Sequence, residues 1–274
     1  MAALLALVSS ALWGTADFLG GTASRRRAAW QVVVWSQTLA GVAIATCVLV
    51  TGAWRGIHPG TWTLWALEAG ALGMAGLLCF YAALARGTMG VVSPIAALGV
   101  LVPLAVGLAS GERLTTIHGV GVGAAIVGIV LASGPELSAK APWRPVALAA
   151  LAALFFGCAI VGVARGSQTS VLMTMLVMRV FSVSVFAVAL FATPSIRRLH
   201  KGEFWPLLVV GVTDVAANIT YGFAATMAEL AIVSVLGSIY PIVTVVLARF
   251  VHHERLARIQ YLGVAAAVAG VALI

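Results

Sequence analysis

The chain has 274 residues, of which 62% are hydrophobic and only 9% are charged. About a quarter of the residues of a soluble domain are charged because its surface faces water, so this composition excludes a soluble globular protein. The net charge of +8 comes from basic residues scattered between apolar runs. This scatter argues against nucleic acid as a partner, because nucleic-acid binding needs the basic residues gathered on one face.

Apolar runs long enough to cross a lipid bilayer follow one another along the whole chain. A transmembrane helix needs about 20 mostly apolar residues. Charges, prolines and glycine clusters divide the chain into ten such runs. The predicted spans are 2–22, 29–52, 63–85, 90–109, 116–133, 145–164, 170–192, 205–226, 230–248 and 257–274. The runs are continuously apolar rather than alternating in polarity, so we expect an all-α integral membrane protein with ten transmembrane helices and not a β-barrel.

The sequence repeats itself at a constant offset of 142 residues. Residues 112–131 and 254–273 share ten identical positions, which in the first copy are Glu112, Arg113, Leu114, Ile117, Gly121, Val122, Ala124, Ala125, Gly128 and Leu131. The predicted repeats are 1–133 and 145–274, with five spans each. Because five is odd, the second copy must begin on the opposite side of the membrane. Two inverted five-helix repeats are typical of secondary transporters, whose binding site lies between the halves.

Small residues in the last helix of each repeat predict close packing between these two helices. Gly119 and Gly123 form a GxxxG pair, and Ala266 and Gly270 form a similar pair, which lets helix backbones approach. The alternative is that these are ordinary small residues of alanine-rich helices. Glu112, at the turn before the first of these helices, is expected to have a structural role as a capping residue.

Asp17 is an acid within the first span. Ser10, Gly14, Asp17 and Gly21 share one helical face, and Trp13 lies beside it. A charged residue at a helix centre costs about 2.5–3.5 kcal/mol on insertion scales, so its presence indicates function or pairing. We expect this face to line a transport cavity; the alternative is an acid reaching back toward the arginines after the span.

A second polar face lies in the eighth span. Gly211, Asp214, Asn218 and Tyr221 fall at i, i+3, i+7 and i+10, which is again one side of a helix. A water-filled cavity explains this face, because no loop is near. The alternative is a hydrogen-bonded pair of Asp214 and Asn218 that only ties helices together.

Two further charged residues lie inside spans. Arg179 is expected to form a structural ion pair, and Gln37 occupies the equivalent place in the first repeat. Glu68 is close to Trp62 and Trp65 and is expected to extend to the membrane interface.

Several segments resemble one known family. They are ALWG near the start, FYAALARGTMGVVSPIAAL, the GERL turn with the glycine-rich helix after it, and the second-half segments YGFAATMAELAIVSVLGSIYP and HERLARIQYLGVAAAVAGVAL. Over nearly its whole length the chain resembles the drug/metabolite transporter superfamily, in its EamA-like branch. The resemblance implies ten helices, a central cavity between the halves, and secondary transport, often export of amino acids, related metabolites or drugs. The acid in the first helix departs from the plainer helix typical of the family.

Together these observations predict a multi-pass secondary transporter of the cell membrane. It would export small metabolites such as amino acids or amine-containing compounds, with coupling to a proton or another cation. The predicted substrate site is Trp13, Asp17, Asp214, Asn218 and Tyr221. One acid would handle the cation or a substrate amine, the amide and phenol would orient the substrate, and the indole would supply an apolar or cation–π wall.

Other functions are left open by the sequence. An uncoupled facilitator or a lipid-linked flippase could share this fold. A non-transporting scaffold or sensor is disfavoured, because it does not need two interconvertible halves. The chain has no HExxH, GxSxG or Walker A pattern, so we expect no enzyme activity, no metal site and no cofactor.

Overall fold

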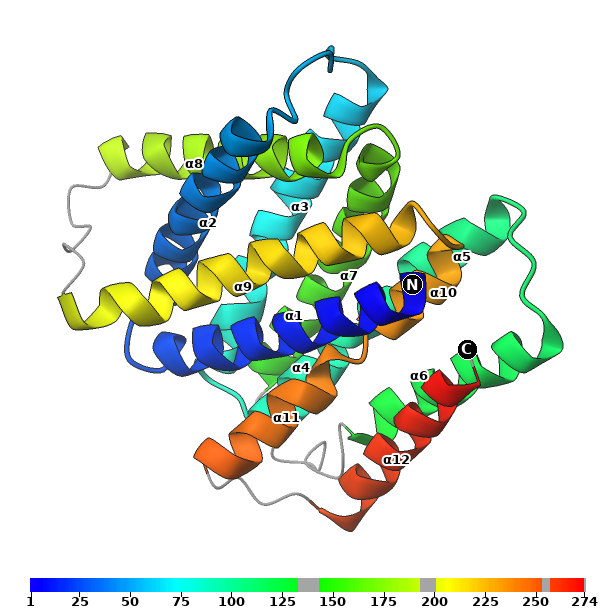
Figure 1. The fold of residues 1–274 in the computed structure, drawn as a ribbon. Helices are drawn as coiled ribbons and strands as arrows, with labels where there is room; N and C mark the ends of the chain where they lie inside the picture. The colour runs from blue at the N-terminus through cyan, green and yellow to red at the C-terminus, as the bar shows by residue number, and fades with distance from the viewer. Residues whose placement is uncertain (133–142, 193–200, 253–256, 274) are drawn as a thin grey trace.

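The computed structural model describes residues 1–132, 143–192, 201–252 and 257–273, and within these ranges the chain is helical with no β-strand (Figure 1). The elements in chain order are α1 (Ala2–Ser24), α2 (Ala29–Thr51), α3 (Thr61–Leu84), α4 (Met89–Ala97), the 3₁₀ helix η1 (Leu98–Val100), α5 (Leu101–Ala109), α6 (Thr116–Ala132), α7 (Trp143–Ser167), α8 (Val171–Ala192), α9 (Lys201–Ala225), α10 (Leu230–Gly237), α11 (Tyr240–Val251) and α12 (Arg258–Ala272). We call α1–α6 the first half and α7–α12 the second half.

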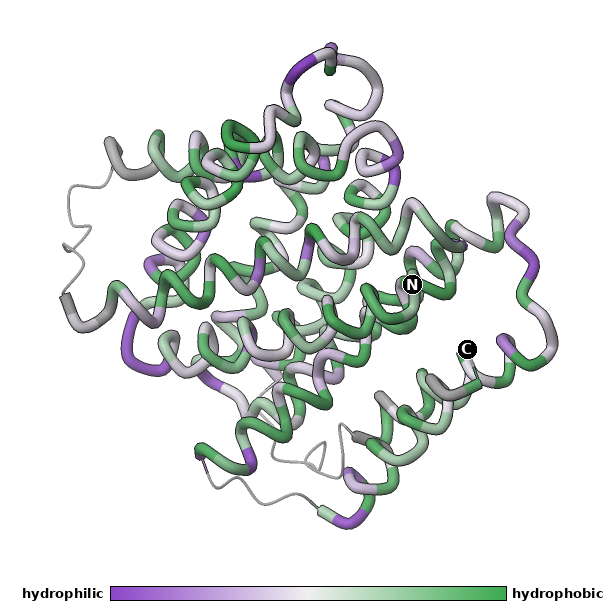
Figure 2. Tube along the Cα trace, viewed as in Figure 1, coloured by the Kyte–Doolittle hydropathy of each residue, from purple (hydrophilic) through white to green (hydrophobic). Residues whose placement is uncertain are grey.

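The multi-pass prediction is confirmed in outline. Eight segments of the described chain are long and apolar enough to cross a membrane, two of them composite: Met89–Ala109 and Leu230–Val251. Helices α6 and α12 occupy the remaining two predicted positions but have 17 and 15 residues. At 1.5 Å per residue they reach about 26 Å and 23 Å, short of a hydrocarbon core of about 30 Å. Hydrophobic residues dominate the helices, and hydrophilic residues gather at their ends (Figure 2).

The fourth and ninth predicted spans are interrupted helices. The fourth passes from α4 through η1 into α5, and the ninth breaks after Gly237 and resumes at Tyr240. Pro241 lies in the first turn of α11, where a missing N–H group costs little. Irregular backbone inside a membrane protein is tolerated where protein buries it or where it lines a cavity.

The two halves pack on each other through equivalent contacts. Helix α1 packs against α9, α10 and α11, while α7 packs against α3, α4, η1 and α5. A side chain at Gly14 of α1 would overlap the carbonyl oxygen of Tyr240, and one at Gly157 of α7 would overlap that of Gly99. Each crossing therefore depends on a glycine that lets a helix approach the interrupted span of the other half.

Helices α6 and α12 pair with each other at one side of the molecule (Figure 1), and α6 also contacts α4 and α10. Gly128 lies against the α12 backbone and Gly270 against the α6 backbone. The predicted role of Gly119 and Gly123 is wrong, because both are exposed and have no packing neighbour within 4 Å. The close packing was predicted correctly, but the contact uses another side of α6. On α12, Ala266 is only partly buried.

Glu112 caps a helix of the opposite half. Its Oε1 accepts a hydrogen bond from the backbone N–H of Leu230 and its Oε2 one from Ala231, both at 2.9 Å. A carboxylate at a helix N-terminus pairs with otherwise unsatisfied N–H groups and with the helix dipole. The capping role is confirmed, but the capped helix is α10 and not the adjacent α6. Its repeat equivalent, Glu254, lies outside the described residues.

Candidate functional site

A cavity of about 780 Å³, including its open mouth, lies between the two halves. Its lining comes from α1, α3, α4, η1, α7, α8, α9, α10 and α11 and includes Ser238 in the break of the ninth span. Small-molecule sites are typically concave and mostly apolar, with a few polar groups that orient the ligand. The location agrees with the expected site between the halves.

The lining residues fall largely at equivalent positions of the two halves, 141 to 143 residues apart. The pairs are Trp13 with Phe156, Asp17 with Ile160, Gly73 with Asp214, Leu77 with Asn218, Ala96 with Gly237, Ala97 with Ser238, and Gly99 with Tyr240. Equivalent backbone positions therefore surround one cavity.

The two sides of the cavity differ in chemistry. We call the side formed by α1, α9, α10 and α11 the polar wall; its polar lining residues are Asp17, Asp214, Asn218, Ser234, Ser238 and Tyr240. We call the side formed by α3, α4, η1 and α7 the apolar wall; its lining residues are Gly73, Leu77, Ala96, Ala97, Gly99, Val100, Phe156, Gly157, Ala159, Ile160 and Val163. A molecule that fills the cavity therefore meets polar groups on one side and hydrocarbon on the other.

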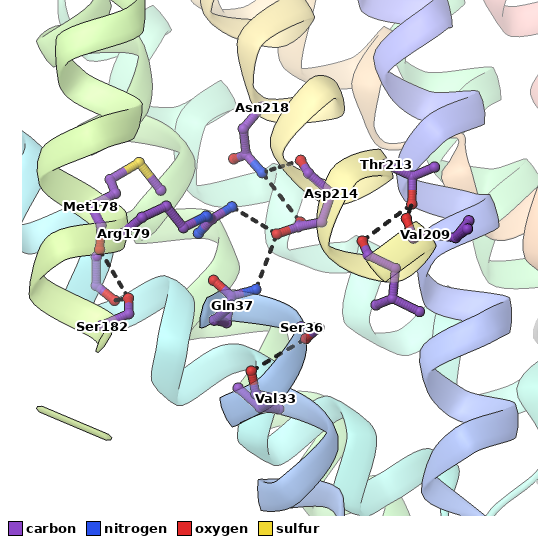
Figure 3. A network of polar contacts seen from close by, with 12 residues as sticks. Val33, Ser36, Gln37, Met178, Arg179, Ser182, Val209, Thr213, Asp214 and Asn218 are labelled. Atoms are coloured by element: carbon purple, nitrogen blue, oxygen red, sulfur yellow. Dashed lines mark hydrogen bonds and ion pairs between the residues drawn. The ribbon is translucent and has the colours of Figure 1, made fainter. Parts of the chain in front are cut away.

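Asp214 of the polar wall is fully paired (Figure 3). Its Oδ2 accepts a hydrogen bond from Arg179 Nη2 at 2.7 Å, which forms an ion pair, and another from Gln37 Nε2 at 3.1 Å. Asn218 Nδ2 donates to Asp214 Oδ1 at 3.2 Å and to the Asp214 carbonyl oxygen at 2.8 Å. All four residues are buried. The guanidinium therefore balances this carboxylate within the protein.

This network unites the two halves. Gln37 of α2 and Arg179 of α8 are 142 residues apart, which is the repeat offset, and both donate to one oxygen atom of Asp214. The structure therefore contains the ion pair expected for Arg179. It also contains the Asp214–Asn218 hydrogen bond weighed as an alternative to a cavity role, while both residues still line the cavity.

Asp17 of the polar wall has no such partner. It lines the cavity, is only 8% exposed, and makes no hydrogen bond or ion pair with any residue that the structure describes. Because Arg179 already balances Asp214, the carboxylate of Asp17 is the uncompensated acid of the cavity.

Of the two aromatic residues predicted for the site, Trp13 lines the cavity and Tyr221 packs behind it. Trp13 lines the cavity, and its ring packs on Tyr221 with centroids 5.5 Å apart and planes tilted by 40°. Tyr221 is fully buried, is not among the lining residues, and shares a 2.7 Å hydrogen bond with Ser234 Oγ. The structure therefore brings Trp13, Asp17, Asp214 and Asn218 to one cavity and places Tyr221 behind the indole.

Two polar residues have surroundings that sequence reasoning missed. Tyr240 lines the cavity, and its hydroxyl is buried without a hydrogen-bond partner. Its only signal in the sequence is its place directly before Pro241 in the ninth predicted span. Contrary to the expectation of an interfacial side chain, Oε2 of Glu68 is buried against Gly162 without a partner. Across the described ranges, no group of three His, Cys, Asp or Glu residues could hold a metal ion.

Sequence comparison decides the family. The sequence model of the EamA-like transporter family matches residues 1–134 and 143–274. The chain belongs to the EamA-like transporter family. No curated protein sequence matches this EamA-like chain. A solved structure titled "Crystal structure of protein" superposes with a TM-score of 0.75 at 19% identity, covering 99% of this chain and 95% of that one, which shows a shared fold alone.

Membership of this family explains both the apolar helices and the cavity between the halves. The EamA-like family consists of membrane transporters, and its two-repeat membrane fold fits the helical architecture described above. The resemblance found from the sequence is confirmed. The chain is therefore a multi-pass membrane protein of a transporter family rather than of an enzyme family.

Proposed function

We propose that this EamA-like protein is a secondary transporter of the cell membrane that exports small metabolites carrying an amine. The observation that carries the proposal is the cavity itself, which has one polar wall, one apolar wall and one uncompensated acid, Asp17. A cationic head group on an apolar body matches this arrangement. The apolar body would lie against Leu77, Phe156 and Ile160, and the head group would lie toward Asp17.

The five residues predicted from the sequence then have distinct parts. Asp17 receives the ammonium group, and Trp13 offers its ring face to the same cation. Tyr221 supports that indole from behind. Asp214 stays paired with Arg179 and, with Asn218, orients polar groups of the substrate by hydrogen bonding.

Coupling follows from competition for one carboxylate. Asp17 can hold a proton or face an ammonium group, but a protonated acid no longer offers a negative charge to a cation. Binding of a proton from one side of the membrane therefore favours release of the amine, and binding of the amine favours release of the proton. Exchange of the two across the membrane is export driven by a proton gradient.

Alternating access requires that the two halves exchange conformations. We propose that the halves, 1–133 and 145–274, are inverted repeats related by a two-fold axis in the membrane plane. The paired lining positions and the equivalent glycine crossings support this relation. Inverted halves can exchange shapes, so states open to either side have similar energies.

The test is transport by the purified full chain in proteoliposomes, with and without a pH gradient. Phenethylamine is a suitable probe because it joins a primary amine to an aromatic body. We expect gradient-driven phenethylamine transport by the wild type and its loss in Asp17→Asn. Tyr261→Phe is the control, since this side chain is 53% exposed on α12, away from the cavity. An Asp17→Asn variant with the wild-type rate and gradient dependence would contradict the proposal, and gradient-independent wild-type transport would indicate a facilitator.

A further inference from the structure

Tyr240 lines the candidate site, and its hydroxyl group is buried without a hydrogen-bond partner among the described residues. The residue lines the cavity at the start of α11, and no described residue forms a hydrogen bond with its Oη. Buried hydroxyl groups in proteins are nearly always hydrogen-bonded, because an unpaired one keeps its full cost of leaving water. A partner from outside the protein would account for this exception.

The packing of α1 on α11 holds Tyr240 close to Asp17. Gly14 lies directly against the Tyr240 carbonyl oxygen. The hydroxyl of Thr244 donates to the carbonyl oxygens of both Gly14, at 3.1 Å, and Tyr240, at 3.2 Å. Asp17 follows Gly14 on the same helical face, and both Asp17 and Tyr240 line the cavity. One crossing therefore fixes an unpaired phenol near an uncompensated carboxylate.

The equivalent crossing in the other half lacks both groups. There α7 packs on the interrupted fourth span, and the positions that correspond to Asp17 and Tyr240 are Ile160 and Gly99. The two crossings share their backbone contacts, because both use a glycine against a carbonyl oxygen. The acid and the phenol are therefore not needed for the backbone contacts of the crossing, so their polar groups are available to a ligand in the cavity.

We propose that Asp17 and Tyr240 form a two-point receptor for an ammonium group that carries N–H bonds. The carboxylate of Asp17 accepts one N–H and balances the charge, and Tyr240 Oη accepts a second N–H. This inference rests on the proposed function, since it takes the cargo to be an amine, and it adds a rule of selectivity. A primary amine satisfies both acceptors, whereas a quaternary ammonium ion of the same body has no N–H and interacts through its charge alone.

The experiment measures binding of two matched probes to the full chain in lipid nanodiscs by calorimetry. The probes are phenethylamine and its N,N,N-trimethyl derivative, which differ only in the head group. The variants are Tyr240→Phe, which removes one oxygen and keeps the ring, and Asp17→Asn. Tyr261→Phe is the matched control, because it makes the same chemical change on an exposed side chain outside the cavity. Thermal unfolding of each variant confirms that it is folded.

We expect Tyr240→Phe to weaken phenethylamine binding about tenfold, the size of one hydrogen bond to a charged group, and to leave the trimethyl derivative unchanged within about twofold. Asp17→Asn should weaken both probes, and Tyr261→Phe neither. Equal losses for both probes in Tyr240→Phe, or no loss for either, would overturn the two-point receptor. If the wild type binds neither probe, or Asp17→Asn binds both normally, the proposed amine function itself fails.

Discussion

The two walls of the cavity are built from equivalent positions yet differ in chemistry. Where α9 carries Asp214 and Asn218, α3 carries Gly73 and Leu77. Tyr240, the first residue of α11, corresponds to Gly99 of η1 in the other half. The helix crossings are alike, with a glycine against a carbonyl oxygen in each. Equivalent backbone positions therefore surround the cavity on both sides, while the side chains that differ between the copies make one wall polar and the other apolar.

The polar wall contains a second contrast, between its two acids. Asp214 has an arginine and two amide donors, whereas Asp17 has no partner in the described part of the chain. Removing one charge of the Asp214–Arg179 pair should lower the stability of the protein. Removing the unpaired charge of Asp17 should instead lower the affinity for the substrate.

Arg179→Met should have the largest effect, because it leaves Asp214 buried without its cation. Loss of one partner of a buried ion pair typically costs about 3–5 kcal/mol. We expect a clear fall in the unfolding temperature of the detergent-purified protein. The double variant Arg179→Met/Asp214→Asn should recover most of the loss, since it removes both charges. If Arg179→Met were as stable as the double variant, the unpaired charge of Asp214 would not destabilise the fold, and the prediction would be wrong.

Asp17→Asn should separate binding from stability. No partner loses a contact, so the unfolding temperature should stay at or above that of the wild type. Affinity for phenethylamine should fall at least about tenfold, or about 1.4 kcal/mol. Asp214→Asn is the comparison, since it strands Arg179 and should lower stability. If Asp17→Asn and Asp214→Asn lowered the unfolding temperature equally, the two acids would not differ in their structural role.

Phe156→Ala tests the apolar wall alone. The ring lines the cavity opposite the acids and packs edge-on to Phe80. Affinity for phenethylamine should fall about tenfold, while affinity for ethylamine, which lacks the aromatic body, should change little. Calorimetric titration of both amines gives the comparison. Equal losses would show that Phe156 acts on the site through the fold and not through the body of the ligand.

Glu112→Gln should have the smallest effect of the four. It keeps one acceptor oxygen but removes the charge and the second hydrogen bond at the start of α10. The expected loss of unfolding free energy is about 1 kcal/mol. Glu229→Gln is the control, because this residue precedes the same helix and its side chain makes no capping bond. Equal losses in the two variants would contradict specific capping by Glu112.

Local patterns allowed most of the fold to be predicted. Continuous apolar runs located the helices, and the offset between copies identified Gln37 and Arg179 as equivalents before their shared acceptor was visible. The polar faces around Asp17 and Asp214 followed from helical periodicity alone. These features depend on residues close in sequence or on a repeat that the sequence displays directly.

The remaining features depend on contacts between distant segments. Glu112 reaches a helix 118 residues away, and no local signal names that partner. The rotation of α6 about its own axis decides that Gly128 is buried and Gly119 is exposed, although both belong to the same glycine-rich run. That the Tyr240 hydroxyl lacks a hydrogen-bond partner can be recognised only from the positions of all neighbouring donors and acceptors in the described structure.

The convergence of Gln37 and Arg179 on Asp214 bears on how such a molecule could arise. Two identical five-helix chains assembled around a symmetry axis would present the same residue at both positions. Such an assembly would also carry the acid twice, because Gly73 occupies the position equivalent to Asp214. Only a fused chain whose copies have diverged can give one donor a charge and the other a neutral amide. Gene fusion thus permits a balanced central ion pair that a symmetric ancestor could not build around a single acid.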